Sequence, residues 1–258
     1  MFSPDSRHCP LPLCTLLLSF VLDVSALTMD ASSPGGKRND PSSTARVHPL
    51  TINSSIDDLL EHPAFKGFGR MLLPWDARPH DATLKLKNIG TLLPYRSHVD
   101  AGVVVSSLNR LIDDAAAGQT IFYDVYSDAE KRAEPTRADT GLFFLRGKPG
   151  APFSVIAPGG GFSYVASVHE GFPYAVEINK HGYNAFVLKY RVGQGGAVAT
   201  QDLAAAISYI FQHADALGVS TRGYSLWGSS AGHAWLHQQA RTGPNASLVR
   251  TFRSHRLL

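Results

Sequence analysis

The sequence predicts an α/β fold, in which a mostly parallel sheet carries helices on both faces. Short β-prone segments bounded by turn residues alternate with longer segments of helical character. Two of the helical segments end at Gly182 and Gly218, where a helix C-terminus favours glycine. Strands that alternate with helices imply right-handed crossovers, which place helices on both faces of a parallel sheet. At 258 residues and 44% hydrophobic, the chain is long enough for one sizeable domain.

The first 28 residues carry features of a secretory signal peptide. An apolar run over 11–22 is followed at 24–26 by a small-residue pattern suited to signal peptidase. The alternative is that the protein begins near Met29. We expect a secreted or periplasmic protein if residues 1–28 act as a signal, and a cytoplasmic one otherwise. Because the apolar run is shorter than the about 20 residues of a spanning helix, we expect no stable membrane span.

Two segments lie between this leader and the main domain. Residues 29–50 are rich in Ser, Pro, Gly and charge, which predicts a disordered linker. Residues 51–120 combine short apolar patches with several prolines, which indicates an irregular and helical segment that lies over the domain as a cap. Within it, residues 101–118 place apolar side chains at helical spacing before Gly118, which predicts a core-facing helix.

The remaining residues, 121–258, are expected to form the α/β domain. Five short segments are rich in β-branched and aromatic residues and are bounded by turn residues, which predicts strands. Longer segments between the last three of them predict helices over 168–181 and 199–217. The predicted strands are 121–126, 141–147, 152–157, 184–190 and 224–228.

Composition argues against several classes of function. The formal charge of +3 comes largely from the end of the chain, where no acidic residue follows Asp215. Aromatic and basic residues do not interleave along any predicted face, so we expect no nucleic-acid partner. Both cysteines, Cys9 and Cys14, precede the predicted domain, so they supply no disulfide, metal ligand or nucleophile there. We expect no metal and no cofactor.

A Gly-x-Ser-x-Gly motif follows the last predicted strand and spans 228–232. In a sharp turn from strand to helix, flanking glycines avoid clashes and the central serine stands at the edge of the sheet. This pattern predicts that Ser230 is a nucleophile. Ser229 lies one residue too early for that role, so we expect it to support the turn.

A second motif carries three consecutive glycines, at 159–161, directly after the predicted strand 152–157. Such a loop leaves backbone N–H groups uncovered, and uncovered N–H groups can stabilise the oxyanion of a tetrahedral intermediate. Taken alone, the loop would be a flexible glycine-rich turn. Its order along the chain relative to the Ser230 motif favours the catalytic interpretation.

The residues 158–162, Pro-Gly-Gly-Gly-Phe, together with Gly-Ser-Ser-Ala-Gly at 228–232, resemble those of α/β-hydrolases. The similarity is to the acetylesterase and lipase group that includes bifunctional acetyl-xylan and feruloyl esterases. It extends to HEGFPYA at 169–175, GYNAFVLKYR at 182–191 and DLAAAISYI at 202–210, and covers about 141–232.

This resemblance implies an α/β-hydrolase-type sheet and a set of site residues. Ser230 would be the nucleophile, and the N–H groups of Gly160, Gly161 and Ala231 would form the oxyanion hole. His169 and Glu170 lie where related esterases carry similar residues, which implies a place in the substrate pocket. Without that role, they would simply begin a helix, where an acid is favoured.

The acid and base of a hydrolase triad follow the nucleophile along the chain in this fold. No Asp or Glu follows Ser230, and His233, His237 and His255 lack a suitable setting, so we expect a chain truncated or shifted in reading frame after the motif. The predicted function is a serine carboxylesterase that cleaves short acyl esters of small molecules or carbohydrates through an acyl-enzyme. It would be inactive or impaired as written. The alternative is a non-catalytic, ligand-binding pseudo-hydrolase or fragment.

Other acidic residues fit structural roles. Asp100, just before the predicted helix 101–118, suits a helix cap. The pairs at 57–58 and 113–114 are expected on solvated helix faces.

Overall fold

The computed structural model describes residues 48–75, 78–94 and 99–232. The predicted signal peptide at 1–28, nearly all of the predicted linker and every residue after Gly232 lie outside this part.

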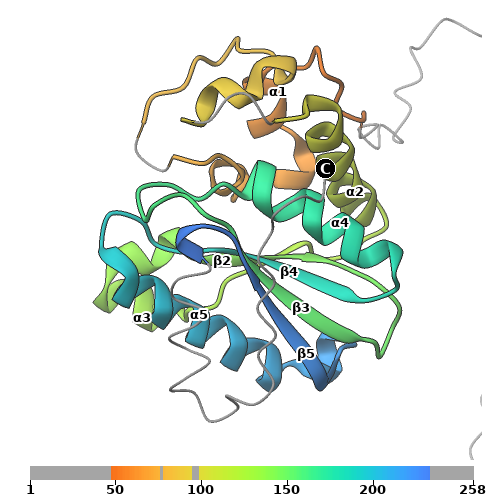
Figure 1. Cartoon of the computed structure of the whole chain (residues 1–258), viewed down its shortest axis with the longest axis vertical. Helices are drawn as coiled ribbons and strands as arrows, with labels where there is room; N and C mark the ends of the chain where they lie inside the picture. Colours follow the sequence, from red (N-terminus) through yellow and green to blue (C-terminus); the bar gives the residue numbers. More distant parts are fainter. Residues whose placement is uncertain (1–47, 76–77, 95–98, 233–258) are drawn as a thin grey trace, which may run out of the picture. The chain divides into compact units, whose positions relative to one another are not determined.

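A five-stranded sheet forms the centre of the described domain, with the order β1-β2-β4-β3-β5 (Figure 1). Strand β3 pairs in parallel with β4 on one side and β5 on the other, whereas β2 pairs antiparallel with β1 and β4. Four of the five strands therefore point the same way, which confirms the predicted mostly parallel sheet. The strands are β1 (Phe122–Tyr123), β2 (Gly141–Leu145), β3 (Pro152–Ala157), β4 (Asn184–Lys189) and β5 (Ser220–Gly228).

Both faces of the sheet are buried, as continuous apolar strands require. Successive residues of β2 alternate between two cores, with Phe143 in one and Phe144 in the other. Helices α2 and α4 cover the first face, and α5 with α6 covers the second (Figure 1). This arrangement confirms the predicted fold class. These helices are α2 (Ala101–Ala116), α4 (Phe172–Lys180), α5 (Gly195–Gln212) and α6 (Ala214–Leu217).

The helix ends largely follow the predictions. Asp100 caps α2 by accepting hydrogen bonds from the backbone N–H groups of Gly102 and Val103. Gly218 ends α6 in the left-handed conformation, with φ +67°. The predicted helix 168–181 differs from expectation, because it begins as a π-helical turn, η6 (Ser167–Gly171), before continuing as α4. The predicted helix 199–217 begins earlier, at Gly195, and is divided into α5 and α6 at His213.

The segment before α2 contributes to the same core as α2 and α4. Short helical turns bury Ile56, Leu59, Phe65 and Leu72 completely, and these side chains pack in the core of the first face. The turns are α1 (Ile56–Leu60), η1 (Pro63–Phe65), η2 (Gly69–Leu72) and η3 (Leu86–Leu92). Short helices α3 (Asp128–Ala133) and η5 (Pro135–Asp139) connect β1 to β2.

The expectation that the acidic pairs lie on solvated helix faces is wrong only for Asp114, since Asp58 is exposed. Asp58 accepts a hydrogen bond from the backbone N–H of Ser55 at 2.6 Å, and Ser55 Oγ accepts one from Asp58 N–H, a capping box that begins α1. Asp114 forms an ion pair with Arg110 on α2, and its side chain is only 13% exposed. The ion pair with Arg110 replaces most of the solvent at Asp114, whereas Asp58 caps α1 from an exposed position.

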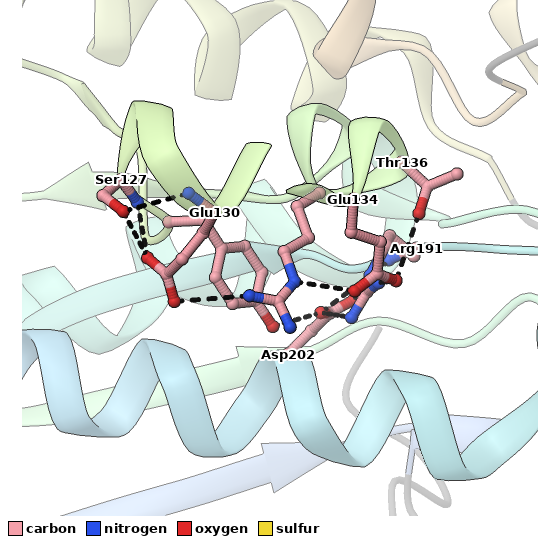
Figure 2. A network of polar contacts seen from close by, with 8 residues as sticks. Ser127, Glu130, Glu134, Thr136, Arg191 and Asp202 are labelled. Carbon is pink, nitrogen blue, oxygen red and sulfur yellow. Dashed lines mark hydrogen bonds and ion pairs between the residues drawn. The ribbon is translucent and has the colours of Figure 1, made fainter. Parts of the chain in front are cut away.

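A buried ionic network fixes the end of β4 against α5 (Figure 2). Arg191 Nη2 lies 2.7 Å from Asp202 Oδ1, and Arg191 Nε also donates to both oxygens of that carboxylate. Both side chains are essentially inaccessible to solvent. Tyr126 Oη donates to Asp202 Oδ1 at 2.7 Å, and Glu134 contacts the far side of the guanidinium. The network satisfies both buried charges and holds the loop after β4 in place.

Candidate active site

Ser230 stands on a strained turn beyond the end of β5. The strand ends at Gly228, and the chain becomes helical again at Ala231. Ser230 has φ +49° and is exposed. A positive φ at a residue other than glycine costs on the order of 1–3 kcal/mol and is typical of functional turns. The turn therefore presents a serine hydroxyl to solvent at the C-terminal edge of the sheet.

The glycine two residues later is required by close packing. A Cβ at Gly232 would lie 2.1 Å from the carbonyl oxygen of Ala157, the last residue of β3. No side chain fits there, so the helix that follows Ser230 lies directly against the end of β3. This contact explains physically why the motif ends in glycine.

The triple-glycine loop passes alongside the same turn. A Cβ at Gly159 would lie 3.0 Å from both the Ser230 Cβ and the Ser229 carbonyl oxygen. Gly160 and Gly161 have positive φ values of +141° and +60°, and a Cβ at Gly160 would lie 1.9 Å from the Tyr164 carbonyl oxygen. The two motifs expected to act together are therefore adjacent. Gly159 permits that approach, and Gly160 permits the tight turn toward Tyr164 within the loop.

The amide groups of this loop differ in what they bind. Within the described residues, the N–H groups of Gly160 and Gly161 donate no hydrogen bond. The N–H of Gly159, in contrast, donates to Glu170 Oε2 at 2.8 Å and lies 3.2 Å from Ser229 Oγ. The loop that lies next to the serine turn therefore carries two amides without a partner among the described residues, and such amides can stabilise a carbonyl group that gains negative charge.

Glu170 and Ser229 connect the loop to the turn. Ser229 is buried, and its hydroxyl donates to Glu170 Oε2. This contact agrees with the expectation that Ser229 supports the turn. His169 is half-buried in the same π-helical turn as Glu170, and its N–H donates to the Ala166 carbonyl. A role of His169 and Glu170 toward substrate stays a prediction.

Tyr190 supports the glycine loop through a buried hydrogen bond. This residue was not identified from the sequence as part of the site. Its hydroxyl donates to the Pro158 carbonyl at 2.8 Å and is completely buried. Burial raises the Tyr190 pKa well above its usual value, and the nearby Glu170 carboxylate raises this pKa further. The hydroxyl therefore remains a donor at physiological pH. Two sequence signals were available, since Tyr190 belongs to the stretch 182–191 that resembles α/β-hydrolases and directly follows β4, at the edge of the sheet where β3 and β5 also end.

The described residues contain neither a metal-binding cluster nor a membrane-spanning helix. No group of three or more His, Cys, Asp or Glu side chains in that part is placed to hold a metal ion. No helix among the described residues is long and apolar enough to cross a bilayer. His233, His237 and His255 lie outside the described residues.

Parts of the chain are similar to hydrolases of solved structure. No family model and no curated protein matches it. An alpha/beta hydrolase from a Medee basin deep-sea metagenome library is 28% identical, with a TM-score of 0.37 over 39% of this chain and 46% of that one. A carboxylesterase from Lactobacillus plantarum is 29% identical, with a TM-score of 0.35 over 41% and 42%.

A third solved structure is the acetyl ester-xyloside bifunctional hydrolase from Caldicellulosiruptor lactoaceticus. It is 23% identical, with a TM-score of 0.40 over 46% of this chain and 44% of that one. The aligned part of the chain thus spans less than half the length of each of these three proteins.

Proposed function

We propose that the chain is an α/β-hydrolase-type serine carboxylesterase that cleaves short acyl esters of small molecules or carbohydrates. The observation that carries this proposal is the close approach of Gly159 to Ser230, on a turn where Ser230 has φ +49°. A strained, exposed serine beside free backbone amides is what acyl transfer needs. The reaction requires no metal or cofactor.

In the proposed reaction, Ser230 Oγ attacks the ester carbonyl carbon while a base accepts the hydroxyl proton. The carbonyl oxygen becomes an oxyanion, which the N–H groups of Gly160, Gly161 and Ala231 stabilise. When the tetrahedral intermediate collapses, the bond to the alcohol breaks and the alcohol leaves with that proton. Water then releases the acid from the acyl-enzyme by the same route. His169 would line the pocket near the acyl or alcohol group.

The base and acid of this reaction would follow Ser230 along the chain, and the sequence beyond it contains no Asp or Glu. The second candidate function is a non-catalytic protein that binds esters in the same pocket. As part of the first proposal, the apolar run within residues 1–28 supports export of the protein.

Hydrolysis of p-nitrophenyl acetate by the full chain tests the proposal. Turnover that disappears in Ser230→Ala supports the esterase, because the variant lacks only the attacking hydroxyl. Ser220→Ala is the matched control, since Ser220 begins β5 at the opposite end of the strand, and it should retain turnover. Ester binding without turnover in the parent protein supports the second candidate. Turnover that survives in Ser230→Ala contradicts both the nucleophile and the mechanism.

A further inference from the structure

One carboxylate oxygen joins the two halves of the proposed site. Glu170 Oε2 accepts a hydrogen bond from Gly159 N–H on the glycine loop, at 2.8 Å, and another from Ser229 Oγ on the serine turn. Gly159 N also lies 3.2 Å from Ser229 Oγ, so the three groups form a closed triangle. Gly159 and Ser229 are 70 residues apart in the sequence. The Glu170 carboxylate is the charged member of this triangle, and the other two groups are neutral.

Glu170 Oε2 is packed directly against the glycine loop and the serine turn. A Cβ at Gly159 would lie 2.6 Å from this oxygen, so the carboxylate occupies the space of the missing side chain. The main chain of Glu170 is held as well, because its N–H donates to the Ala166 carbonyl at 2.7 Å. The carboxylate is thus fixed by its own turn and by both segments it contacts.

These contacts determine where the reacting groups lie. A hydrogen bond to Gly159 N–H fixes the peptide plane that precedes the free amides of Gly160 and Gly161. A hydrogen bond to Ser229 Oγ fixes the residue that precedes Ser230. Hydrogen bonds to an ionised carboxylate are roughly twice as strong as neutral ones, so Glu170 couples the two segments more tightly than an uncharged acceptor would.

We infer that Glu170 is a positioning residue that sets the distance between the oxyanion-binding amides and the Ser230 hydroxyl. This inference rests on the proposed function for its catalytic consequence. The coupling of the two segments through Glu170 stands independently of that function. The role differs from the substrate contact that the resemblance implies, since Glu170 acts here through Gly159 and Ser229.

Amide hydrogen exchange of the full chain tests the coupling without any need for turnover. The variants are Glu170→Ala, which removes the carboxylate, Glu170→Gln, which keeps an acceptor without charge, and Ser229→Ala, which removes the partner on the turn. Glu177→Ala on α4 is the matched control, because Glu177 is exposed and pairs with Lys180. The probes are peptides that cover residues 157–166, and a thermal melt checks that each variant folds.

We expect exchange within 157–166 to rise about tenfold in Glu170→Ala, the factor that corresponds to one lost hydrogen bond to a charged group. Glu170→Gln should rescue part of the effect, and Glu177→Ala should show none. Ser229→Ala should also speed exchange in this distant loop, but should add less in a protein that already carries Glu170→Ala, where only the direct contact between Gly159 N–H and Ser229 Oγ is left to lose. Unchanged loop exchange in Glu170→Ala, or fully additive effects in the double variant, would overturn the inference.

Kinetics with p-nitrophenyl acetate separate this inference from the proposed function. If the parent protein is active, Glu170→Ala should lower kcat on the order of 100-fold with little change in KM, because misplacement of about 1 Å has that cost. An unchanged kcat would overturn the catalytic part of the inference. If the parent protein shows no turnover while loop exchange responds as expected, the proposed function fails and the coupling stands.

Discussion

Gly159 and Ser230 lie so close that a Cβ built on the glycine would stand 3.0 Å from the Cβ of the serine. The same Cβ would lie 2.6 Å from Glu170 Oε2 and 3.0 Å from the Ser229 carbonyl oxygen. Real Cβ atoms do not approach a neighbour below about 3 Å without a shift, because cores are close-packed. The absence of a side chain at position 159 therefore sets the minimum distance between the glycine loop and the serine turn.

Gly159→Ala should separate activity from stability. The added methyl group pushes the loop away from Ser230. If the parent protein is active, turnover of p-nitrophenyl acetate should therefore fall on the order of 100-fold, and overpacking costs about 1–3 kcal/mol. Gly150→Ala is the control, because Gly150 has φ +73° with no atom near its Cβ position. Its backbone strain costs about 1–2 kcal/mol. Equal loss of turnover in both variants would contradict the assigned geometry.

Asp202→Asn should destabilise the fold strongly. The substitution leaves the guanidinium of Arg191, which is 1% exposed, without its buried counter-charge. Breaking a buried ion pair by removing one partner costs about 3–5 kcal/mol. Urea unfolding measures the loss. Glu177→Gln, which breaks the exposed pair with Lys180, should cost less than about 1 kcal/mol. Similar midpoints for the two variants would show that the network in Figure 2 contributes little.

The sheet could be predicted from the sequence because its signals are local. Apolar β-prone runs bounded by turn residues placed β3 at Pro152–Ala157, as observed, and placed β2 and β4 within two residues of their observed ends. The glycines after α4 and α6 have left-handed φ values of +85° and +67°, which only glycine adopts readily. Both motifs of the candidate site also follow strands, so their edge of the sheet was predictable.

The contacts between distant segments could not be predicted in the same way. Glu170, Gly159 and Ser229 come from a π-helical turn, a glycine loop and a turn after β5, and no spacing or periodicity relates them. The segment before α2 is similar, since its short turns are held by buried side chains such as Phe65 rather than by helical periodicity. Tertiary packing rather than local propensity determines the contacts of Glu170 and the short turns before α2.

Alkaline pH should destabilise the protein through its buried tyrosines. Burial raises the pKa of Tyr190 and of Tyr126 above the ordinary value of about 10. A phenol with a raised folded pKa contributes stability that is present below the unfolded pKa, and that stability is lost as pH rises above it. Melting temperatures between about pH 8 and pH 11.5 should therefore be level up to about pH 10 and fall beyond it.

Tyr190→Phe identifies one source of this dependence. The variant should melt at a lower temperature at pH 8, because the Pro158 carbonyl loses its buried donor at a cost of about 1–3 kcal/mol. Its decline above about pH 10 should be shallower than that of the parent protein. Tyr183→Phe is the control, since Tyr183 is 49% exposed, and it should keep the parent slope. An unchanged slope in Tyr190→Phe would contradict the raised pKa.

Trp75 connects the segment before α2 to the end of the glycine loop. Its ring lies 4.6 Å from the Tyr164 ring between centroids, and its Nε1 donates to the Leu92 carbonyl. One residue away, the Pro74 carbonyl accepts a hydrogen bond from Val165 N–H at 3.0 Å. Since Tyr164 closes the turn that begins at Gly160, loss of the Trp75 ring should loosen that turn.

Trp75→Ala should lower the free energy of unfolding by about 2 kcal/mol, because loss of a fully buried ring costs ~3–5 kcal/mol and Trp75 is only partly buried. The variant should also speed amide exchange within 160–166. Trp75→Phe keeps the ring contact with Tyr164 but removes the donor to Leu92, so it should lose less stability and leave exchange in that turn close to the parent rate. Arg78→Ala removes the guanidinium that lies over the Trp75 ring and should cost about 1 kcal/mol or less. If Trp75→Ala and Trp75→Phe speed loop exchange equally, the indole donor to Leu92 matters more for the order of that turn than the ring contact with Tyr164.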